Sequence, residues 1–240
     1  SPVKGPWGGG NKIITELAAR LHSKGHSVTY ELHSPDIDVI FCFDPRPNDK
    51  GKWYQHFLDY KNQFGAKIVQ RVGDLGTHGK PELTKLVKQS ISNSDYLIFP
   101  SEWAKEYIGF TGNNLSIIHN APLEIFHKYK NNDKLDKKIN LVTHHWSTNP
   151  KKGFSYYKQL DKFVGENPNF NFIYIGRTPD NFKFENAKYV EPIGDNDLLA
   201  RLLSRSTIYV TASEEEAGAN HVLEGVAAGL PIVFHKNGGS

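Results

Sequence analysis

The chain has 240 residues, of which 38% are hydrophobic and 23% are charged, and this composition is ordinary for a globular protein of one or two domains. Its net charge of +3 suits an anionic substrate or contact with a membrane surface, and it is too weak to indicate a nucleic-acid partner. Because Cys42 is the only cysteine, the chain can form no internal disulfide, which favours a reducing compartment. Cys42 lies in an apolar segment, so we expect its side chain to be buried. We expect a cytoplasmic protein, because no secretory signal is evident and no apolar run approaches the roughly 20 residues that span a bilayer.

Both ends of the chain are unusual. No methionine is present, and Ser1 leads directly into a glycine-rich segment where a strand would be expected. The chain stops at Ser240, just after another expected strand. These features predict truncation at both ends.

Residues 5–30 predict a glycine-rich loop, a helix and a strand. After the loop, apolar residues recur at helical spacing, namely Ile13, Ile14, Leu17, Ala18 and Leu21. The loop matches neither of two phosphate-binding patterns, because Asn11-Lys12 follows where Lys-Ser/Thr is needed and a third glycine at the dinucleotide spacing is missing. A nicotinamide-dependent dehydrogenase is therefore disfavoured, and a purely structural turn remains an alternative for the loop.

Short apolar strands then alternate with helices. Strands are expected at 38–43, 67–71, 96–99 and 115–119, and helices at 52–64, 83–91 and 101–110, with Ser101 as an N-cap. After a charged linker at 127–138, strands are expected at 139–145, 170–176, 208–211 and 231–235, and helices at 154–166 and 195–204. This pattern is typical of an α/β protein with two Rossmann-like domains and parallel sheets, here at 1–126 and 139–240.

The clearest candidate site lies in residues 211–239, which predict a strand end, an acidic turn and a helix that begins near Ala219. The first N–H groups of a helix attract anions, and Gly218 lets a phosphate approach the backbone. Glu224, more than one turn inside the helix, can accept hydrogen bonds from a ribose diol, and Glu216 in the turn can bind a second polyol. A diphosphate with a sugar at each end fits this stretch; an exposed acidic turn before a core helix is the alternative.

The same stretch resembles the C-terminal signature of glycosyltransferase family 4, whose members have the GT-B fold. The matching segments are Glu216-x7-Glu224, Ala228-Gly229-Leu230-Pro231-Ile232 and Gly238-Gly239. The resemblance implies two Rossmann-like domains with parallel sheets facing across a cleft. It also implies a retaining enzyme that moves a hexose from a UDP- or GDP-sugar to a hydroxyl of a glycan, lipid or small-molecule acceptor. No metal and no further cofactor are expected.

The resemblance implies roles for individual residues. Glu224 would bind the ribose and Glu216 the transferred sugar, while Lys152 would stabilise the departing diphosphate. The backbone N–H groups that would assist Lys152 belong to Gly218, Ala219, Asn220 and His221. Ile193 lies in the segment where the family binds the nucleotide base, although this segment could equally be a strand leaving the core. In the first domain, the family's glycine loop packs against the phosphates or the acceptor, and here it contains Gly9, Gly10 and Asn11.

Two positions depart from the family's pattern. Ser147 stands where the family carries an arginine, and Arg177 at the end of the next strand could supply the missing charge. The family's catalytic histidine of the first domain has no counterpart in residues 70–79, where Asp74 or His78 could bind the acceptor sugar.

Three alternatives stay open. His144-His145-Trp146 lacks the spacing of a zinc site; structural histidines at a strand end explain the pair best, and a backbone contact to the donor sugar is the alternative. A GT-B epimerase would isomerise the nucleotide sugar without an acceptor. A non-catalytic module would bind nucleotide sugars without releasing the nucleotide, and the two departures from the pattern favour it.

Overall fold

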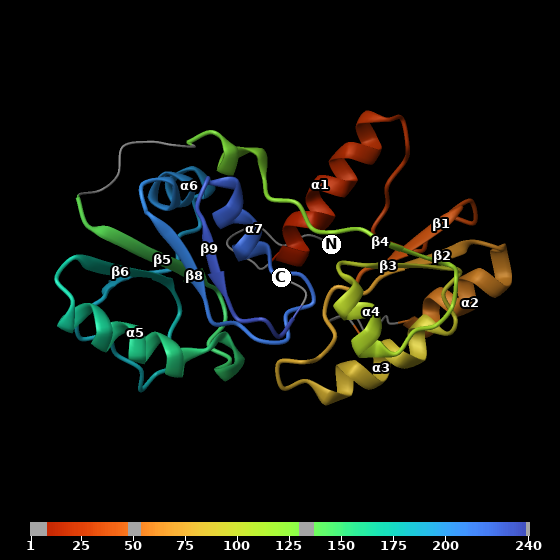
Figure 1. The fold of residues 1–240 in the computed structure, drawn as a ribbon. Coiled ribbons are helices and arrows are strands. Elements are labelled where there is room, and N and C mark those ends of the chain that lie inside the picture. Colours follow the sequence, from red (N-terminus) through yellow and green to blue (C-terminus); the bar gives the residue numbers. More distant parts are fainter. Residues whose placement is uncertain (1–8, 48–53, 130–136, 239–240) are drawn as a thin grey trace. The chain divides into compact units, whose positions relative to one another are not determined.

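The computed structural model describes residues 9–47, 54–129 and 137–238. They form two α/β units that divide between His119 and Asn120, and the ribbon in Figure 1 labels the elements of both. Each unit contains one parallel sheet with helices packed on it.

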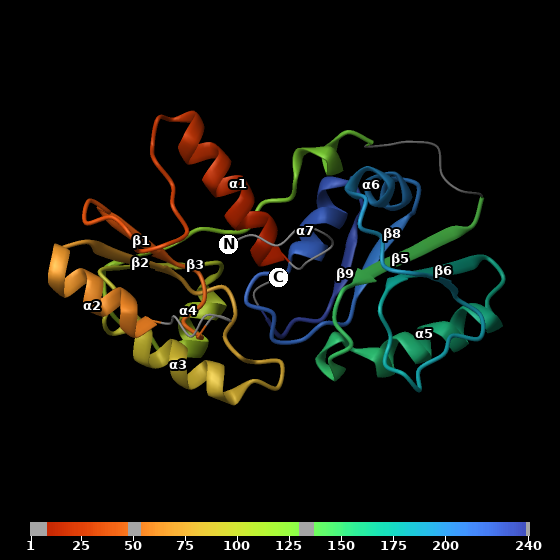
Figure 2. The same ribbon diagram turned by 180° about the vertical axis from the view of Figure 1, so that it is seen from behind.

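The first unit has a four-stranded parallel sheet in the order β1-β2-β3-β4. Its strands are β1 (Val39–Cys42), β2 (Lys67–Arg71), β3 (Tyr96–Phe99) and β4 (Leu115–Ile117), and its helices are α1 (Gly9–Ser23), α2 (Tyr54–Phe64), α3 (Pro81–Ile91) and α4 (Glu102–Ile108). Helices α2, α3 and α4 lie on one side of this sheet in both Figure 1 and Figure 2. Every second residue of a strand faces the same way, so Ile40 and Cys42 are buried together against α2, as expected for Cys42.

The N-terminal elements agree with the sequence only in part. The apolar positions expected in the first helix are half-buried in α1, but residues 27–30 form no strand, so that prediction was wrong. Tyr30 is 48% exposed, and Thr29 Oγ1 accepts the N–H of Glu31 at 3.2 Å. A local side-chain–backbone bond of this kind competes with strand pairing, and the exposed ring gives the segment little reason to pack on a sheet. Ser101 does cap α4, since its Oγ accepts the N–H of Ala104 at 3.1 Å.

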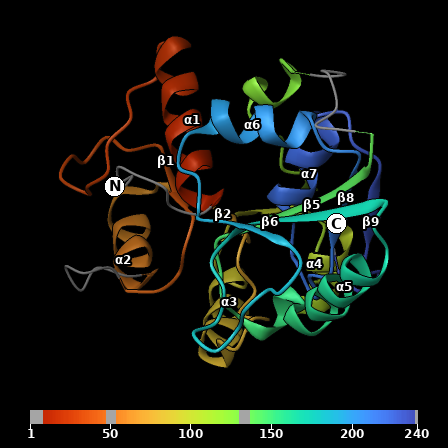
Figure 3. The same ribbon diagram turned by 90° about the vertical axis from the view of Figure 1, so that its left-hand side faces the viewer.

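The second unit has a five-stranded parallel sheet in the order β7-β6-β5-β8-β9. Its strands are β5 (Ile139–His145), β6 (Phe170–Gly176), β7 (Lys188–Val190), β8 (Ile208–Thr211) and β9 (Ile232–Phe234), and its helices are α5 (Phe154–Glu166), α6 (Asn196–Ser204), α7 (Asn220–Ala227) and the short 3₁₀ helices η1 (Glu124–His127) and η2 (Pro150–Lys152). Helix α5 covers one face of the sheet, and α6 and α7 cover the other (Figure 3). The central strands β5 and β6 are buried on both faces over most of their length.

The division between the units lies earlier than the sequence indicated. Phe126 is fully buried among Val142, Leu199 and Leu203, so the segment from Asn120 onward packs with the second unit and not with the first. Within the expected linker, residues 130–136 lie outside the described part of the chain.

Candidate functional site

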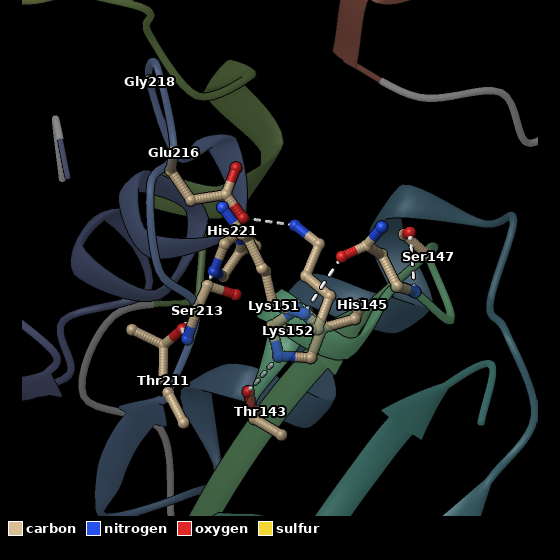
Figure 4. A network of polar contacts seen from close by, with 12 residues as sticks. Thr143, His145, Ser147, Lys151, Lys152, Thr211, Ser213, Glu216, Gly218 and His221 are labelled. Carbon is tan, nitrogen blue, oxygen red and sulfur yellow. Dashed lines mark hydrogen bonds and ion pairs between the residues drawn. The ribbon is translucent and has the colours of Figure 1, made fainter. Parts of the chain in front are cut away.

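The candidate site lies in the second unit, at the carboxyl ends of β5, β6 and β8 and at the start of α7. Ligands of open α/β sheets bind at this edge. Here β5 ends with His144 and His145, β6 ends with Gly176, and β8 ends with Thr211. Figure 4 shows the polar side chains that gather at this place.

An ion pair joins two residues that the sequence separates widely. Nζ of Lys152, at the end of η2, contacts Oε1 of Glu216 in the loop after β8, and their side chains are only 11% and 14% exposed (Figure 4). Gly153 makes this approach possible, because its φ is +83° and an added Cβ would lie 2.4 Å from the carbonyl oxygen of Ala212. Beside it, Lys151 pairs with Glu215 in a more exposed position. The sequence predicted both Lys152 and Glu216 as site residues but not their contact.

The loop after β8 is held by hydrogen bonds from three segments. The N–H of Glu214 donates to the carbonyl of Lys151 at 2.9 Å, and the N–H of Glu215 donates to the carbonyl of Asn237 at 2.7 Å. Nδ2 of Asn120 donates to the carbonyl of Gly218 at 3.1 Å. Glu215 has a φ of +53°, a conformation that is uncommon for residues other than glycine. The loop therefore has a defined shape directly before α7.

Helix α7 begins at Asn220, with Ala219 at the N-cap and no side-chain cap. Its first turn contains no acidic residue, so the positive end of the helix dipole has no carboxylate to offset it there. The first N–H groups of a helix have no carbonyl partner within the helix. Gly218, Asn220 and His221 lie at this end of the helix, and their role in binding an anion stays a prediction.

Glu224 is buried within α7 and does not face solvent, since it is 6% exposed. Its Oε2 lies 2.7 Å from Nε2 of His144, and Nδ1 of His144 lies 3.1 Å from the hydroxyl of Tyr209. Tyr209 follows Ile208 in β8, on the buried side of that strand. This chain of contacts fixes the orientation of the glutamate.

A second polar network surrounds His145. Its Nε2 lies 2.5 Å from the hydroxyl of Tyr157, which also accepts the N–H of Ala212 at 3.1 Å. Nε2 of His221 lies 3.1 Å from Oγ1 of Thr211. Burial lowers the pKa of His145 well below its ordinary value, and burial, together with the Lys152 ammonium, lowers the pKa of His221 to about 3. Both rings are therefore neutral at pH 7. Nδ1 of His145 is buried and has no hydrogen-bond partner among the described residues.

A hollow of about 180 Å³ adjoins His144 and His145. Its lining residues come from the ends of β5 and β6, from the segment after β7 and from α6: His144, His145, Trp146, Ile175, Gly176, Pro192, Ile193 and Leu199. Ile193 is thus at the site, half-buried against the core. Ser147 lies just beyond β5, where its Oγ accepts the N–H of Asn149 at 3.1 Å. Arg177 follows β6 and is exposed.

The remaining predicted residues belong to the first unit. Gly9, Gly10 and Asn11 form the first turn of α1 and not a loop, so the helix begins within the expected glycine loop; residues 5–8 of that loop lie outside the described residues. The carboxylate of Asp74 contacts Nζ of Lys80 and the N–H of Gly76. Burial acts to raise the pKa of Asp74, but these two hydrogen bonds and the positive charges of Lys80 and Arg46 together lower it, so the group is a carboxylate at neutral pH.

Sequence reasoning assigned no side-chain role at the site to His144, Tyr157 or Tyr209. The histidines were expected to be structural, and their burial and contacts within the protein agree with that. The position of Tyr209 could have been predicted from β8, because Tyr209 and Thr211 are alternate residues of that strand and therefore lie on the same face. The contact between His144 and Glu224 could not be predicted, because the two residues are 80 positions apart in the sequence.

Within the described ranges, no group of three or more His, Cys, Asp or Glu side chains could hold a metal ion. No helix in that part of the chain is long and apolar enough to cross a bilayer.

Neither a protein-family model nor a curated protein sequence matches the chain. Solved structures match it over most of its length. HepE from Anabaena, in complex with UDP and glucose, is 14% identical with a TM-score of 0.62, over 98% of this chain and 66% of HepE. The pneumococcal O-GlcNAc transferase GtfA, in complex with UDP and GlcNAc, is 13% identical with a TM-score of 0.61, over 92% of this chain and 44% of GtfA. WaaG, a glycosyltransferase involved in lipopolysaccharide biosynthesis, is 15% identical with a TM-score of 0.59, over 98% of this chain and 79% of WaaG.

These likenesses confirm the fold class expected from the sequence, which is the α/β GT-B fold of glycosyltransferases. The chain spans about two thirds of the length of HepE and less than half of GtfA. Membership of family 4 stays a prediction.

Proposed function

We propose that the protein is a retaining glycosyltransferase related to family 4, which moves a hexose from a UDP- or GDP-linked donor to a hydroxyl of a glycan or lipid acceptor. One observation carries the proposal. The largely buried pair Lys152–Glu216 lies at the carboxyl ends of the second sheet, beside the start of α7, and the same helix holds the buried Glu224. Cation, helix N-terminus and two carboxylates are the groups that an activated sugar requires. Solved structures of the same fold that contain UDP support this assignment.

The donor would be held at three points. The ribose diol would bind Glu224, and the base would lie in the hollow next to Ile193. The diphosphate would lie at the N–H groups of Gly218, Ala219, Asn220 and His221. There the dipole of α7 and the ammonium of Lys152 oppose its negative charge.

The reaction would use this charge arrangement directly. As the bond between the sugar carbon and the diphosphate oxygen breaks, negative charge grows on the leaving group, and Lys152 stabilises it more than it stabilises the ground state. The acceptor oxygen attacks on the face that the leaving group vacates, and its proton passes to the departing diphosphate oxygen. Glu216 would hold hydroxyls of the transferred sugar. We expect no metal requirement, because Lys152 and α7 supply the positive charge that a metal provides elsewhere.

The test is release of nucleoside diphosphate by the 240-residue chain from UDP- and GDP-hexoses in the presence of sugar and lipid acceptors. We expect release that depends on the acceptor. Lys152→Gln should lower kcat about 100-fold, as for the loss of one group that stabilises transition-state charge. Lys151→Gln is the matched control, since it removes the same charge from the adjacent, more exposed pair, and it should change kcat little. Donor isomerisation without acceptor, or binding without release, would contradict the proposal.

A further inference from the structure

The hollow of about 180 Å³ in the second unit lies at the end of β6, between the ends of the two strands that flank it. In this sheet β6 stands between β5 and β7, and it pairs in parallel with both. Trp146 directly follows β5, whereas Pro192 and Ile193 follow β7. The lining residues therefore come from both flanking strands as well as from the end of β6 itself.

The end of β6 carries no side chain at its last position. Gly176 has a φ of +137°, and an added Cβ would lie 1.9 Å from the carbonyl oxygen of His145, so only glycine fits there. Adjacent strands lie about 4.8 Å apart, so β5 and β7 are roughly 10 Å apart across this position. A flat ring in contact with a group on each side needs about 3.5 Å for each contact. Side chains that lean inward from the two flanking strands can therefore enclose one flat ring.

The lining offers mainly apolar surface. Ile175 and Leu199 are each 2% exposed and belong to the core beneath the hollow. The side chain of His144 is engaged by Glu224 and by Tyr209, and the lining residues include no Lys, Arg, Asp or Glu. A phosphate would find no ammonium or guanidinium here, and a hexose would exchange the water around its hydroxyl groups for apolar side chains, which is costly. A flat heteroaromatic ring suits this lining better than either.

Trp146 is half-buried at this hollow and has neither a ring contact nor a hydrogen-bond partner within the described part of the chain. It belongs to neither core cluster of the second unit. By contrast, Tyr157 and Tyr174 each contact several other aromatic rings. Aromatic side chains gain stability when another ring packs on their face. The indole of Trp146 is thus available for a ring that the protein itself does not supply.

We propose that Trp146 binds the base of the nucleotide donor by stacking, with Ile193 on the opposite face of the base. The identity of the ligand rests on the proposed function, and the inference adds the residue on which the base-dependent part of the affinity depends. Stacking on an aromatic side chain strengthens the binding of one base roughly tenfold or more. Every base has such a face, so this contact favours a nucleotide over free diphosphate without selecting between uracil and guanine.

Calorimetric titration of the whole chain with UDP and GDP tests this role, and the nucleotide that binds more tightly is then used for the variants. Trp146→Leu keeps an apolar side chain but loses the flat ring, so its affinity should fall roughly tenfold or more. Trp146→Phe restores a smaller ring and should lose only about threefold. Trp103→Leu is the matched control, because it removes an indole that stacks on Tyr107 in the first unit, and it should bind as the native chain does.

The same titrations locate the group that stacks on the indole. The base is common to the nucleoside diphosphate and the corresponding nucleotide hexose, so Trp146→Leu should weaken the binding of both by the same factor. A loss confined to the nucleotide hexose would mean that the indole contacts the sugar, and it would overturn the inference.

A readout in the native chain stands even if Trp146→Leu does not fold. The indole N–H resonance of Trp146, identified by its absence from Trp146→Phe, should shift when the nucleotide is added and stay in place with pyrophosphate. An unshifted resonance, or equal nucleotide affinity in the native chain and Trp146→Leu, would overturn the inference and leave the proposed function standing. Nucleotide binding that depends on Trp146, without transfer to any acceptor, would overturn the proposed function alone. A native chain that binds no nucleotide would overturn both.

Discussion

Nε2 of His144 lies 2.7 Å from Oε2 of Glu224, and the two side chains are 4% and 8% exposed. The contact joins the end of β5 to the middle of α7. Burial of a carboxylate is costly unless hydrogen bonds compensate, and His144 provides such a bond while Tyr209 orients the ring from its other side. The position of Glu224 is therefore determined by the protein itself, before any donor binds.

The first prediction concerns this pair. His144→Ala and Glu224→Ala should each lower the free energy of unfolding, because each leaves a buried polar partner without its bond, at a cost of about 1–3 kcal/mol. The double variant should lose less than the sum of the two single losses. Urea unfolding of the four proteins measures the coupling energy, and strict additivity would show that the contact contributes nothing to stability.

The second prediction separates the two glutamates next to the lysines. Glu216→Ala should lower kcat while leaving donor affinity nearly unchanged, since Glu216 would contact the transferred sugar and position Lys152. Glu215→Ala removes the same group from the more exposed neighbouring pair and should have little effect on turnover. Steady-state kinetics with the best donor gives the comparison, and equal kcat values for both variants would refute the assignment of Glu216.

The third prediction concerns the loop before α7. Asn120→Ala removes the hydrogen bond to the carbonyl of Gly218, so the backbone that would hold the diphosphate becomes less well ordered. We expect nucleoside-diphosphate affinity to fall several-fold. Asn114→Ala is the control, because it removes a similar amide–carbonyl bond, of 3.0 Å to Asp95, in the first unit. Calorimetry that finds both variants equal to the native chain would exclude a role for Asn120.

The fourth prediction concerns Gly153. Gly153→Ala combines a left-handed backbone with a collision at Ala212, whereas Gly109→Ala has a φ of +77° and nothing within 4 Å. The Gly109 variant should lose about 1–2 kcal/mol, the cost of the left-handed conformation alone. The Gly153 variant should lose clearly more, because η2 must move away from β8. Urea unfolding compares the two, and equal losses would mean that the close approach is not needed.

The fifth prediction is a pH dependence. Below pH 6.5 the unfolded chain protonates its histidines, whereas folded His221 stays neutral until about pH 3 and His145 is lowered in the same direction. The unfolded state thus binds more protons in this window, so stability falls as the pH decreases from 6.5 towards 3, by on the order of 1 kcal/mol per pH unit for His221, and His145 contributes in the same direction. Unfolding midpoints between pH 7 and pH 4.5 should fall less steeply in His221→Gln. Parallel curves would contradict the buried, neutral state of this ring.

The sequence predicted most of the fold because short, mainly apolar strand segments alternate regularly with segments whose apolar residues recur at helical spacing. The strands β5 and β6 and the cap at Ser101 follow from local patterns. The prediction of a strand at 27–30 was wrong because the spacing of apolar residues and their strand propensity do not show whether a neighbouring strand is available for pairing. At the site, Lys152 and Glu216 could be named individually, but their contact depends on the approach of Gly153 to Ala212, which no local pattern encodes.

The most direct measurement is calorimetric titration of UDP and GDP into the native chain and into Glu224→Ala. The account predicts that the native chain binds one of the two nucleotides with a measurable, saturable affinity and that the variant, checked to be folded, loses this binding. Binding of equal strength in the two proteins, or no binding of either nucleotide to the native chain, would contradict the claim that α7 and its glutamate hold an activated sugar.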